Sequence, residues 1–316
     1  MKNMRIETPI FLIGSERSGS TLLRLMLDHH PRIAFNLESE YIVSQIADDG
    51  TFPPMERYRA WLNNDRVFRH SRVTIDERLD YEALANDFLC QKLARDNKEL
   101  VGATIHYKFA RLPKIWPAAK FIYIYRDGRD VAASVRRMGW AGNAYVAADR
   151  WLEAEREWDG LRARIRDDQW IEIRYEDLIA DTRTHLARIC VFLGVEYSDA
   201  MFDYVHTSTY GTPDVALRYQ WKSRVRRVDV ERIEEKLGER LLARGYALSG
   251  YPRISIGRWR RRGIYLWSRL GTLWFRFNRY GVVTASKEIL FRRLGLSQLH
   301  IKVIKDIDFI IDANLK

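Results

Sequence analysis

The sequence has few cysteines and no long apolar run, and each absence excludes a class of protein. Only Cys90 and Cys190 occur among 316 residues, so neither a disulfide framework nor a cysteine-based metal site is indicated. The longest apolar runs, such as residues 9–14, are far too short to span a bilayer. The polar residues 1–7 lack the apolar core of a secretory signal. We therefore expect a globular protein in a reducing, cytoplasmic setting.

Acidic residues are scarce in one segment only. The whole chain carries 53 Lys and Arg against 42 Asp and Glu, a net charge of +11. Residues 251–316 hold 14 of the basic residues and four of the acidic ones, whereas the first 250 residues hold 39 and 38. Nearly all of the excess positive charge therefore belongs to the C-terminal segment, and it is not a property of the main domain.

The first 250 residues alternate between strand-like and helix-like segments. Three short apolar runs have the character of buried strands: residues 9–13, 120–125 and 170–174. Helical spacing follows each run and recurs in residues 145–166 and 228–244. Strands separated by helices predict a parallel sheet covered on both faces, that is, a three-layer α/β/α core. We expect residues 1–250 to form this domain and residues 251–316 to form a helical extension.

A glycine-containing loop, Gly14-Ser-Glu-Arg-Ser-Gly-Ser-Thr21, stands between the first strand and the first helix. In that position backbone N–H groups and a helix N-terminus can point at an anion. The spacing fits the P-loop pattern, except that Ser20 replaces the lysine that nucleoside triphosphatases use; Arg17 supplies a cation earlier in the loop. A structural turn with a serine-rich cap is the alternative. The strand, hydroxyls and arginine together favour a P-loop-like anion site.

Three motifs resemble those of one enzyme family. The run from Arg17-Ser-Gly-Ser-Thr to Asp28-His-His-Pro31 resembles the 5′-phosphosulfate loop of sulfotransferases that use 3′-phosphoadenosine 5′-phosphosulfate (PAPS). It is particularly similar to the tyrosylprotein sulfotransferases and the bacterial branch near them. The run from Phe121 to Ser134 resembles the family's 3′-phosphate site, and Tyr175-Glu-Asp-Leu178 ahead of Phe192-Leu-Gly194 resembles a third family segment. The resemblance covers about residues 8–246.

The resemblance implies which residues hold the donor phosphates. Arg17 would stabilise the bridging and 5′-phosphate oxygens. The rest of the loop would donate hydrogen bonds to the same oxygens: Ser18, Gly19, Ser20 and Thr21. Arg126 and Ser134 would hold the 3′-phosphate, and their spacing of eight lets a turn and two helical turns converge on one anion. A surface ion pair with Asp127 or Asp130 is the alternative for Arg126.

Three aromatic or basic residues complete the implied donor site. Tyr175 would lie near the adenine, and core packing at a strand end is its alternative. Gln220-Trp-Lys-Ser-Arg224 resembles the segment that closes over the nucleotide, which implies that Trp221 packs on the cofactor and that Lys222 or Arg224 contacts phosphate. A tryptophan that anchors a loop to the core is the other interpretation of Trp221.

Two residues qualify as the general base, and the sequence leaves both open. Glu38, with Glu40 as a near neighbour, falls where tyrosylprotein sulfotransferases place a catalytic glutamate. His106 matches the histidine that cytosolic sulfotransferases use, although their Lys-Thr-His triplet is absent here. A histidine near its ordinary pKa suits an aliphatic hydroxyl acceptor.

The acceptor is not identified by the sequence, and a glycan, peptide, phenol or lipid hydroxyl all remain open. Residues 48–97 resemble in position the variable insert that shapes the acceptor pocket. The resemblance implies PAPS as the donor. No cluster of His, Asp and Glu has the spacing of metal ligands, so we expect no metal.

The C-terminal segment has an amphipathic pattern. Large apolar side chains recur at spacings of three, four and seven: Trp259, Leu266, Leu270, Trp274 and Phe277. Arg262, Arg269 and Arg276 form a cationic row seven residues apart. This pattern favours a helix that binds an anionic membrane surface peripherally, and a helix docked on the core is the alternative. We expect no nucleic-acid partner, because no recognition module is present. Residues 302–316 alternate loosely and indicate an edge strand or a docked terminus.

The sequence therefore predicts a sulfotransferase that moves the sulfonate of PAPS in line to an acceptor hydroxyl or amine and releases adenosine 3′,5′-bisphosphate. A kinase-like P-loop enzyme is the second hypothesis, and Ser20 in place of the lysine disfavours it. A non-catalytic protein that binds membranes or partners and has kept the fold is the third.

Overall fold

The computed structural model describes residues 5–313, apart from the side chains of residues 297, 309 and 311–313. The chain divides into two compact units. The first comprises the described residues up to Asp127 together with Arg150–Gln220. The second comprises Gly128–Asp149 together with the described residues from Trp221 onward.

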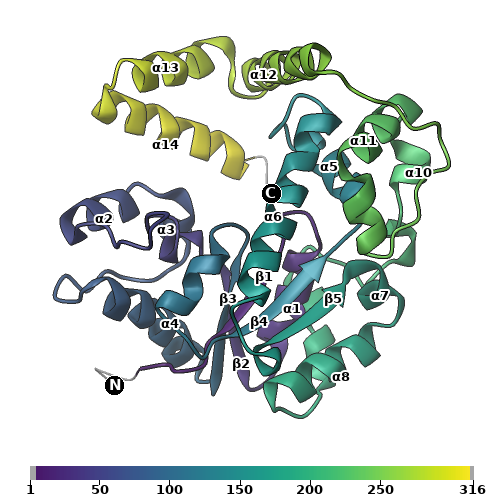
Figure 1. Cartoon of the computed structure of the whole chain (residues 1–316). Helices are drawn as coiled ribbons and strands as arrows, with labels where there is room; N and C mark the ends of the chain where they lie inside the picture. Colours follow the sequence, from purple (N-terminus) through teal and green to yellow (C-terminus); the bar gives the residue numbers. More distant parts are fainter. Residues whose placement is uncertain (1–4, 314–316) are drawn as a thin grey trace. The chain divides into compact units, whose positions relative to one another are not determined.

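The first unit is built on a five-stranded sheet (Figure 1). Its strands are β1 (Ile10–Ile13), β2 (Ile33–Glu38), β3 (Leu100–Ile105), β4 (Lys120–Tyr125) and β5 (Trp170–Arg174). The order across the sheet is β2-β3-β1-β4-β5, and every neighbouring pair is parallel. The predicted strands β1, β4 and β5 are confirmed. The sequence interpretation missed β2 and β3, because Gly102 and Thr104 interrupt one apolar run and polar residues follow Phe35 in the other.

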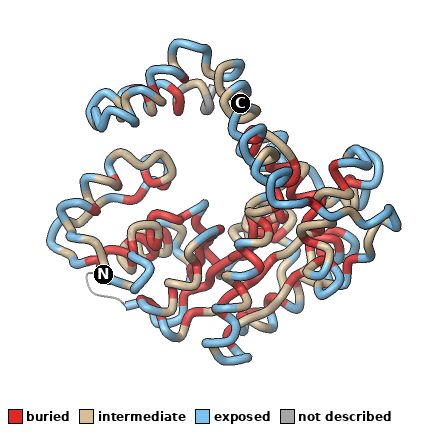
Figure 2. Tube along the Cα trace, turned by 45° about the horizontal axis from the view of Figure 1, so that its top comes forward, coloured by how far each residue is buried: buried red, intermediate tan, exposed pale blue. Residues whose placement is uncertain are grey.

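Helices cover both faces of this sheet. Successive side chains of a strand point to opposite faces, so Leu12 and Ile122 join one apolar cluster while Phe11 and Phe121 join another. The first cluster includes residues of α1 (Ser20–His29), α7 (Tyr175–Ala180) and α8 (Thr182–Leu193). The second includes residues of α4 (Tyr81–Asp96) and α6 (Ala144–Arg162). The central strands are accordingly buried (Figure 2), and the predicted three-layer α/β/α core is confirmed.

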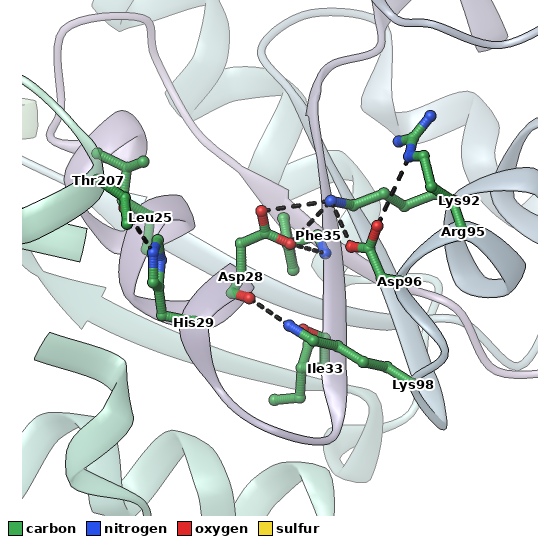
Figure 3. A network of polar contacts seen from close by, with 10 residues as sticks. All are labelled: Leu25, Asp28, His29, Ile33, Phe35, Lys92, Arg95, Asp96, Lys98 and Thr207. Atoms are coloured by element: carbon green, nitrogen blue, oxygen red, sulfur yellow. Dashed lines mark hydrogen bonds and ion pairs between the residues drawn. The ribbon is translucent and has the colours of Figure 1, made fainter. Parts of the chain in front are cut away.

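A polar network fixes the C-terminal end of α1 to β2 and α4 (Figure 3). The Asp28 carboxylate accepts a hydrogen bond from the Phe35 N–H at 2.7 Å and pairs with the Lys92 ammonium at 2.9 Å. Lys92 also pairs with Asp96 at 2.6 Å. Lys98 donates to the carbonyls of Asp28 and Ile33. The helix that starts at the glycine-containing loop is therefore held firmly at its far end.

The segment between β2 and β3 is packed rather than loose. It contains η1 (Glu40–Ile42), α2 (Met55–Leu62) and α3 (Arg66–His70) ahead of α4. Buried tyrosines tie it together, because the hydroxyls of Tyr58 and Tyr81 donate to the carbonyls of Tyr41 and Ile42. The role of residues 48–97 in shaping an acceptor pocket stays a prediction. The remaining helical elements of this unit are short: η2 (Phe109–Lys114), η3 (Asp167–Gln169), η4 (Asp199–Phe202), α9 (Tyr204–Thr207) and η5 (Val215–Leu217).

The second unit is helical throughout its described elements. They are α5 (Gly128–Arg137), the start of α6, α10 (Trp221–Arg224), α11 (Arg227–Ala243), α12 (Arg258–Tyr280), α13 (Val282–Arg293) and α14 (Ser297–Ala313). The expected edge strand near the C-terminus is wrong, because α14 is a helix that packs on α13. Val303 and Ile307, four residues apart, are buried apolar side chains of this helix, and that spacing is helical. Lys316 lies outside the described residues.

Candidate active site

The predicted site residues of the first unit gather at the carboxyl edge of the sheet. The loop from Gly14 follows β1, and Glu38 is the last residue of β2. His106, Arg126 and Tyr175 come directly after β3, β4 and β5. Parallel strands present their carboxyl ends at one edge, which is where open α/β sheets bind ligands. Five separate stretches of sequence thus contribute to one edge.

The loop after β1 has a backbone that demands glycine at two positions. Gly14 has φ of +145°, and a Cβ there would lie 2.1 Å from the carbonyl oxygen of Ile124. Gly19 has φ of +95°, and a Cβ there would lie 2.2 Å from the ring of Tyr175. Between them, Arg17 adopts φ of +70°, which is unfavourable for a residue with a side chain. The loop is therefore closely packed on β4 and Tyr175 in a strained conformation.

Hydrogen-bond donors of this loop fit an anion. Gly19 caps α1 without a side-chain hydrogen bond to the first turn, which begins at Ser20 and Thr21. The Ser18 side chain is fully buried, and its Oγ has no partner within residues 5–313. An unsatisfied buried hydroxyl is costly unless a ligand completes it, and helix N-termini favour negative charge. The exposed Arg17 adds a cation to the same loop.

His106 joins the end of β3 to the loop. Its Nδ1 lies 3.1 Å from the carbonyl oxygen of Gly14, and its Nε2 lies 3.4 Å from the Ser20 hydroxyl. Because a carbonyl only accepts hydrogen bonds, Nδ1 carries the proton and Nε2 of the neutral ring keeps its lone pair. That lone pair is the one a general base needs. The Glu38 carboxylate lies 3.9 Å from the same Nε2, so the two candidate bases of the sequence are neighbours.

The two glutamates after β2 have different environments. The Glu38 side chain is 53% exposed, whereas Glu40 is buried and its Oε1 accepts a hydrogen bond from the His106 backbone N–H at 3.1 Å. Burial raises the pKa of Glu40 to about 7. A register shift in the β2–β3 pairing between Asn36 and Glu38 sets Glu38 opposite Thr104. Such bulges redirect side chains beside functional sites.

Arg126 and Tyr175 pack together on the other side of β1. The Arg126 guanidinium lies 4.6 Å above the Tyr175 ring, and its Nη2 donates to the Leu217 carbonyl at 2.8 Å. The Trp151 indole donates to the Arg126 carbonyl at 2.9 Å. Tyr175 is buried against Gly19, so it supports the loop and Arg126 at the same time.

The remaining predicted residues belong to the second unit. Ser134 is buried on α5. Trp221 is also buried, with the Arg129 guanidinium 3.7 Å from its ring. The backbone N–H of Trp221 donates to the Asp130 carboxylate at 2.7 Å. Lys222 follows it on α10. The sequence interpretation missed Arg129, which is buried and pairs with Glu234 at 2.6 Å.

No helix in residues 5–313 is both long and apolar enough to cross a membrane. In the same part of the chain, no three His, Cys, Asp or Glu side chains gather as metal ligands would.

The known proteins that this chain resembles in sequence and in structure are sulfotransferases. Protein-tyrosine sulfotransferase 2 of Gallus gallus is 26% identical over 215 residues, which is 65% of this chain and 55% of that protein. The chain spans about half the length of several of the curated relatives it matches. The sulfotransferase domain of the Synechococcus PCC 7002 olefin synthase has a TM-score of 0.52 at 22% identity and covers 75% of this chain and 97% of that domain.

A second solved structure agrees. The sulfotransferase domain of the curacin biosynthetic pathway has a TM-score of 0.50 at 20% identity and covers 78% of this chain and all of that domain. At these identities the structures establish the fold alone. The sequence model of the sulfotransferase family matches residues 9–199. Because that match extends over more than half of the sequence, from β1 past β5, the chain belongs to the sulfotransferase family.

Proposed function

We propose that this protein transfers the sulfonate of PAPS to an acceptor hydroxyl or amine and releases adenosine 3′,5′-bisphosphate. One observation carries the proposal: the loop with the unpartnered, buried Ser18 hydroxyl lies within hydrogen-bond reach of a histidine whose Nδ1 faces a carbonyl oxygen and whose Nε2 faces the Ser20 hydroxyl. An anion site and a base side by side are what transfer of an anionic group to a hydroxyl requires.

Residues of the first unit would hold the donor at its 5′ side. Ser18 Oγ and the first-turn N–H groups of α1 would donate hydrogen bonds to the phosphosulfate, and Arg17 would neutralise charge on the leaving phosphate. PAPS supplies the activated sulfonate when it is bound. Arg126 and Ser134 would hold the 3′-phosphate, and Trp221 with Lys222 would close over the nucleotide, as the family resemblance implies.

Glu38 and His106 would act on the acceptor as a pair. His106 Nε2 would take the proton of the acceptor hydroxyl, because its lone pair is fixed by the Nδ1–Gly14 hydrogen bond. The Glu38 carboxylate, 3.9 Å away, would stabilise the imidazolium that results. The half-exposed Glu38 would also contact the acceptor. Proton removal by His106 would let the acceptor oxygen form its bond to sulfur while the bond from sulfur to the bridging phosphate oxygen breaks and adenosine 3′,5′-bisphosphate leaves.

Calorimetry with adenosine 3′,5′-bisphosphate, ATP and AMP tests the proposal. The bisphosphate should bind much more tightly than ATP or AMP, because the site recognises the 3′-phosphate. Equal binding of the three nucleotides would exclude PAPS as the donor and would favour a kinase-like enzyme. Arg126→Ala should weaken binding of the bisphosphate severely, and retained affinity would remove Arg126 from the site. Binding without turnover on any acceptor would favour a non-catalytic protein.

For the acceptor, the comparisons support a functional group but not a class of molecule. The curated relative is named for protein tyrosine, a hydroxyl acceptor, and this supports a hydroxyl on the acceptor here. Labelled PAPS offered with a panel of glycans, peptides, phenols and lipids would identify the class.

We also propose that the protein is cytoplasmic and binds an anionic membrane surface peripherally through residues 251–316. Helix α12 holds seven arginines and no acidic residue. Three of its tryptophans are largely exposed: Trp259 at 78%, Trp267 at 72% and Trp274 at 70%. Tryptophans beside arginines suit the boundary between lipid headgroups and acyl chains.

The other face of α12 packs within the second unit, which leaves the tryptophan face for the proposed membrane contact. Gly142 touches α12 so closely that a Cβ there would lie 2.1 Å from the Ser268 carbonyl oxygen. The Asn143 amide donates to the Ile264 carbonyl at 2.8 Å. The tryptophan face is consequently presented outward by a helix that is already folded. Two copies of this face would repel each other, because both carry the arginines of α12. An anionic lipid surface is therefore the favoured partner.

A further inference from the structure

We infer that Glu40 is a positioning residue for His106: its carboxylate holds the histidine backbone in the place from which the ring reaches Ser20. This inference deepens the proposed function and rests on it for its chemical meaning, because it identifies what fixes the base.

The β2–β3 ladder ends just before His106. The Ser39 N–H donates to the Thr104 carbonyl at 2.9 Å, which is the last backbone hydrogen bond between the two segments. Two residues further on, the His106 N–H donates to the Glu40 side chain instead, at 3.1 Å. The carboxylate therefore takes the place of the next backbone acceptor where β2 gives way to η1. Beyond His106 the chain turns sharply, with Lys108 at φ of +56°.

His106 is thus held from two neighbouring segments. The Glu40 carboxylate, which follows β2, fixes the backbone, and the Gly14 carbonyl, which follows β1, fixes the ring. Both residues are buried, since Glu40 is 7% exposed and His106 is 7% exposed. A buried carboxylate is unfavourable unless its hydrogen bonds compensate, so its contact with His106 is the most direct reason for its presence. If the backbone anchor is lost, the ring can leave the Gly14 carbonyl and the tautomer is no longer fixed.

Nuclear magnetic resonance of the full chain with ¹⁵N-labelled histidine tests this directly, with His106→Gln to assign the signal. Wild type should show His106 as the Nδ1–H tautomer. Glu40→Leu removes the acceptor, so we expect mixed tautomers and at least tenfold faster exchange of the His106 amide proton. Glu40→Gln keeps an amide oxygen as acceptor and should restore both readouts to within threefold of wild type. Glu38→Leu is the matched control, because Glu38 touches the ring but does not hold the backbone.

Wild-type tautomer and exchange in Glu40→Leu would overturn the inference, as would a Glu40→Gln variant that behaves like Glu40→Leu. If Glu40→Leu does not fold, Glu40→Ala is read by the same two criteria. Binding of adenosine 3′,5′-bisphosphate should stay within threefold of wild type in the Glu40 variants. If the wild-type protein does not bind adenosine 3′,5′-bisphosphate, the proposed function is contradicted. The tautomer measurement would still decide whether Glu40 positions His106.

Discussion

The sheet edge of the first unit and helix α12 of the second use charge in opposite ways. At the edge, each charged group has a defined neighbour: Arg126 lies over Tyr175, Glu40 holds His106, and Glu38 lies beside the same ring. On α12, seven arginines share 23 residues without an acidic residue, and most of them are exposed. The edge contributes almost nothing to the net charge of the chain, whereas the C-terminal segment contributes nearly all of it.

The difference teaches that net charge and anion recognition are separate properties. A few oriented donors in a buried loop bind an anion by geometry, and salt screens such contacts weakly. A dense, solvent-exposed array binds by long-range attraction, which falls as ionic strength rises. Each of the following variants changes either the sheet edge or helix α12 and leaves the other unchanged. They are given from the largest expected effect to the smallest.

Arg17→Ala should have the largest effect. Loss of a preorganised cation at the leaving phosphate lowers turnover by roughly 10²–10³. Turnover is measured with labelled PAPS and an acceptor found in the panel. The strained φ of +70° is relieved by glycine rather than by alanine, so Arg17→Gly serves as the folding control. Turnover within a few fold of wild type in both variants would remove Arg17 from the transition state.

His106→Ala should lower turnover more than Glu38→Ala does. Removal of a general base lowers turnover by about 10² or more. We expect a loss of about 10² for His106→Ala, below that for Arg17→Ala, and a smaller one for Glu38→Ala. The double variant should lose little more than His106→Ala, because the two side chains act as one pair. Bisphosphate affinity, measured by calorimetry, is the control and should not change. Additive losses would show two independent roles.

Glu40→Gln should change the pH dependence of stability. The folded protein holds the Glu40 proton up to a pKa of about 7, whereas an unfolded chain releases it near pH 4.3. The stabilising contribution is therefore full below about pH 4 and is lost as pH rises through 7. Relative to wild type, Glu40→Gln should gain about 3 kcal/mol in free energy of unfolding between pH 4 and pH 8.

Denaturant unfolding at both pH values measures this change. The exposed Glu56→Gln is the matched control and should follow the wild-type trend. Parallel curves for wild type and Glu40→Gln would mean that Glu40 is not protonated preferentially in the folded protein.

The tryptophan face of α12 should show the smallest effect per residue. In flotation with phosphatidylglycerol–phosphatidylcholine vesicles, W259S/W267S/W274S should bind about tenfold more weakly, as apolar area leaves the interface. R258Q/R260Q/R269Q should lose a similar factor at low salt and less at high salt. R57Q/R156Q/R188Q removes the same charge from exposed positions of the first unit and should bind as wild type. An equal loss of vesicle binding in R57Q/R156Q/R188Q would mean that the protein binds vesicles through its net charge and not through α12.

Sequence reasoning reached the loop, the arginine after β4 and the tyrosine after β5, because each follows a strand with a clear apolar run. It could not choose between Glu38 and His106, because their strands were not predicted and the pairing of β2 with β3 is a long-range contact. Arg129 was missed for a related reason: its contacts with Trp221 and Glu234 join residues about a hundred positions apart. Alternation of loosely apolar residues near the C-terminus was misleading, since it also satisfies a helix.

The strand order has a consequence for how such an enzyme can diversify. The groups proposed to act on the acceptor follow β2 and β3, whereas those proposed to hold the nucleotide follow β4 and β5, with the loop of β1 between them. The two flanks lie on opposite sides of β1 in the sheet, so the residues after β2 and β3 can change with little direct effect on those after β4 and β5. New acceptors can therefore be explored by replacing residues after β2 and β3 while the donor half is inherited unchanged.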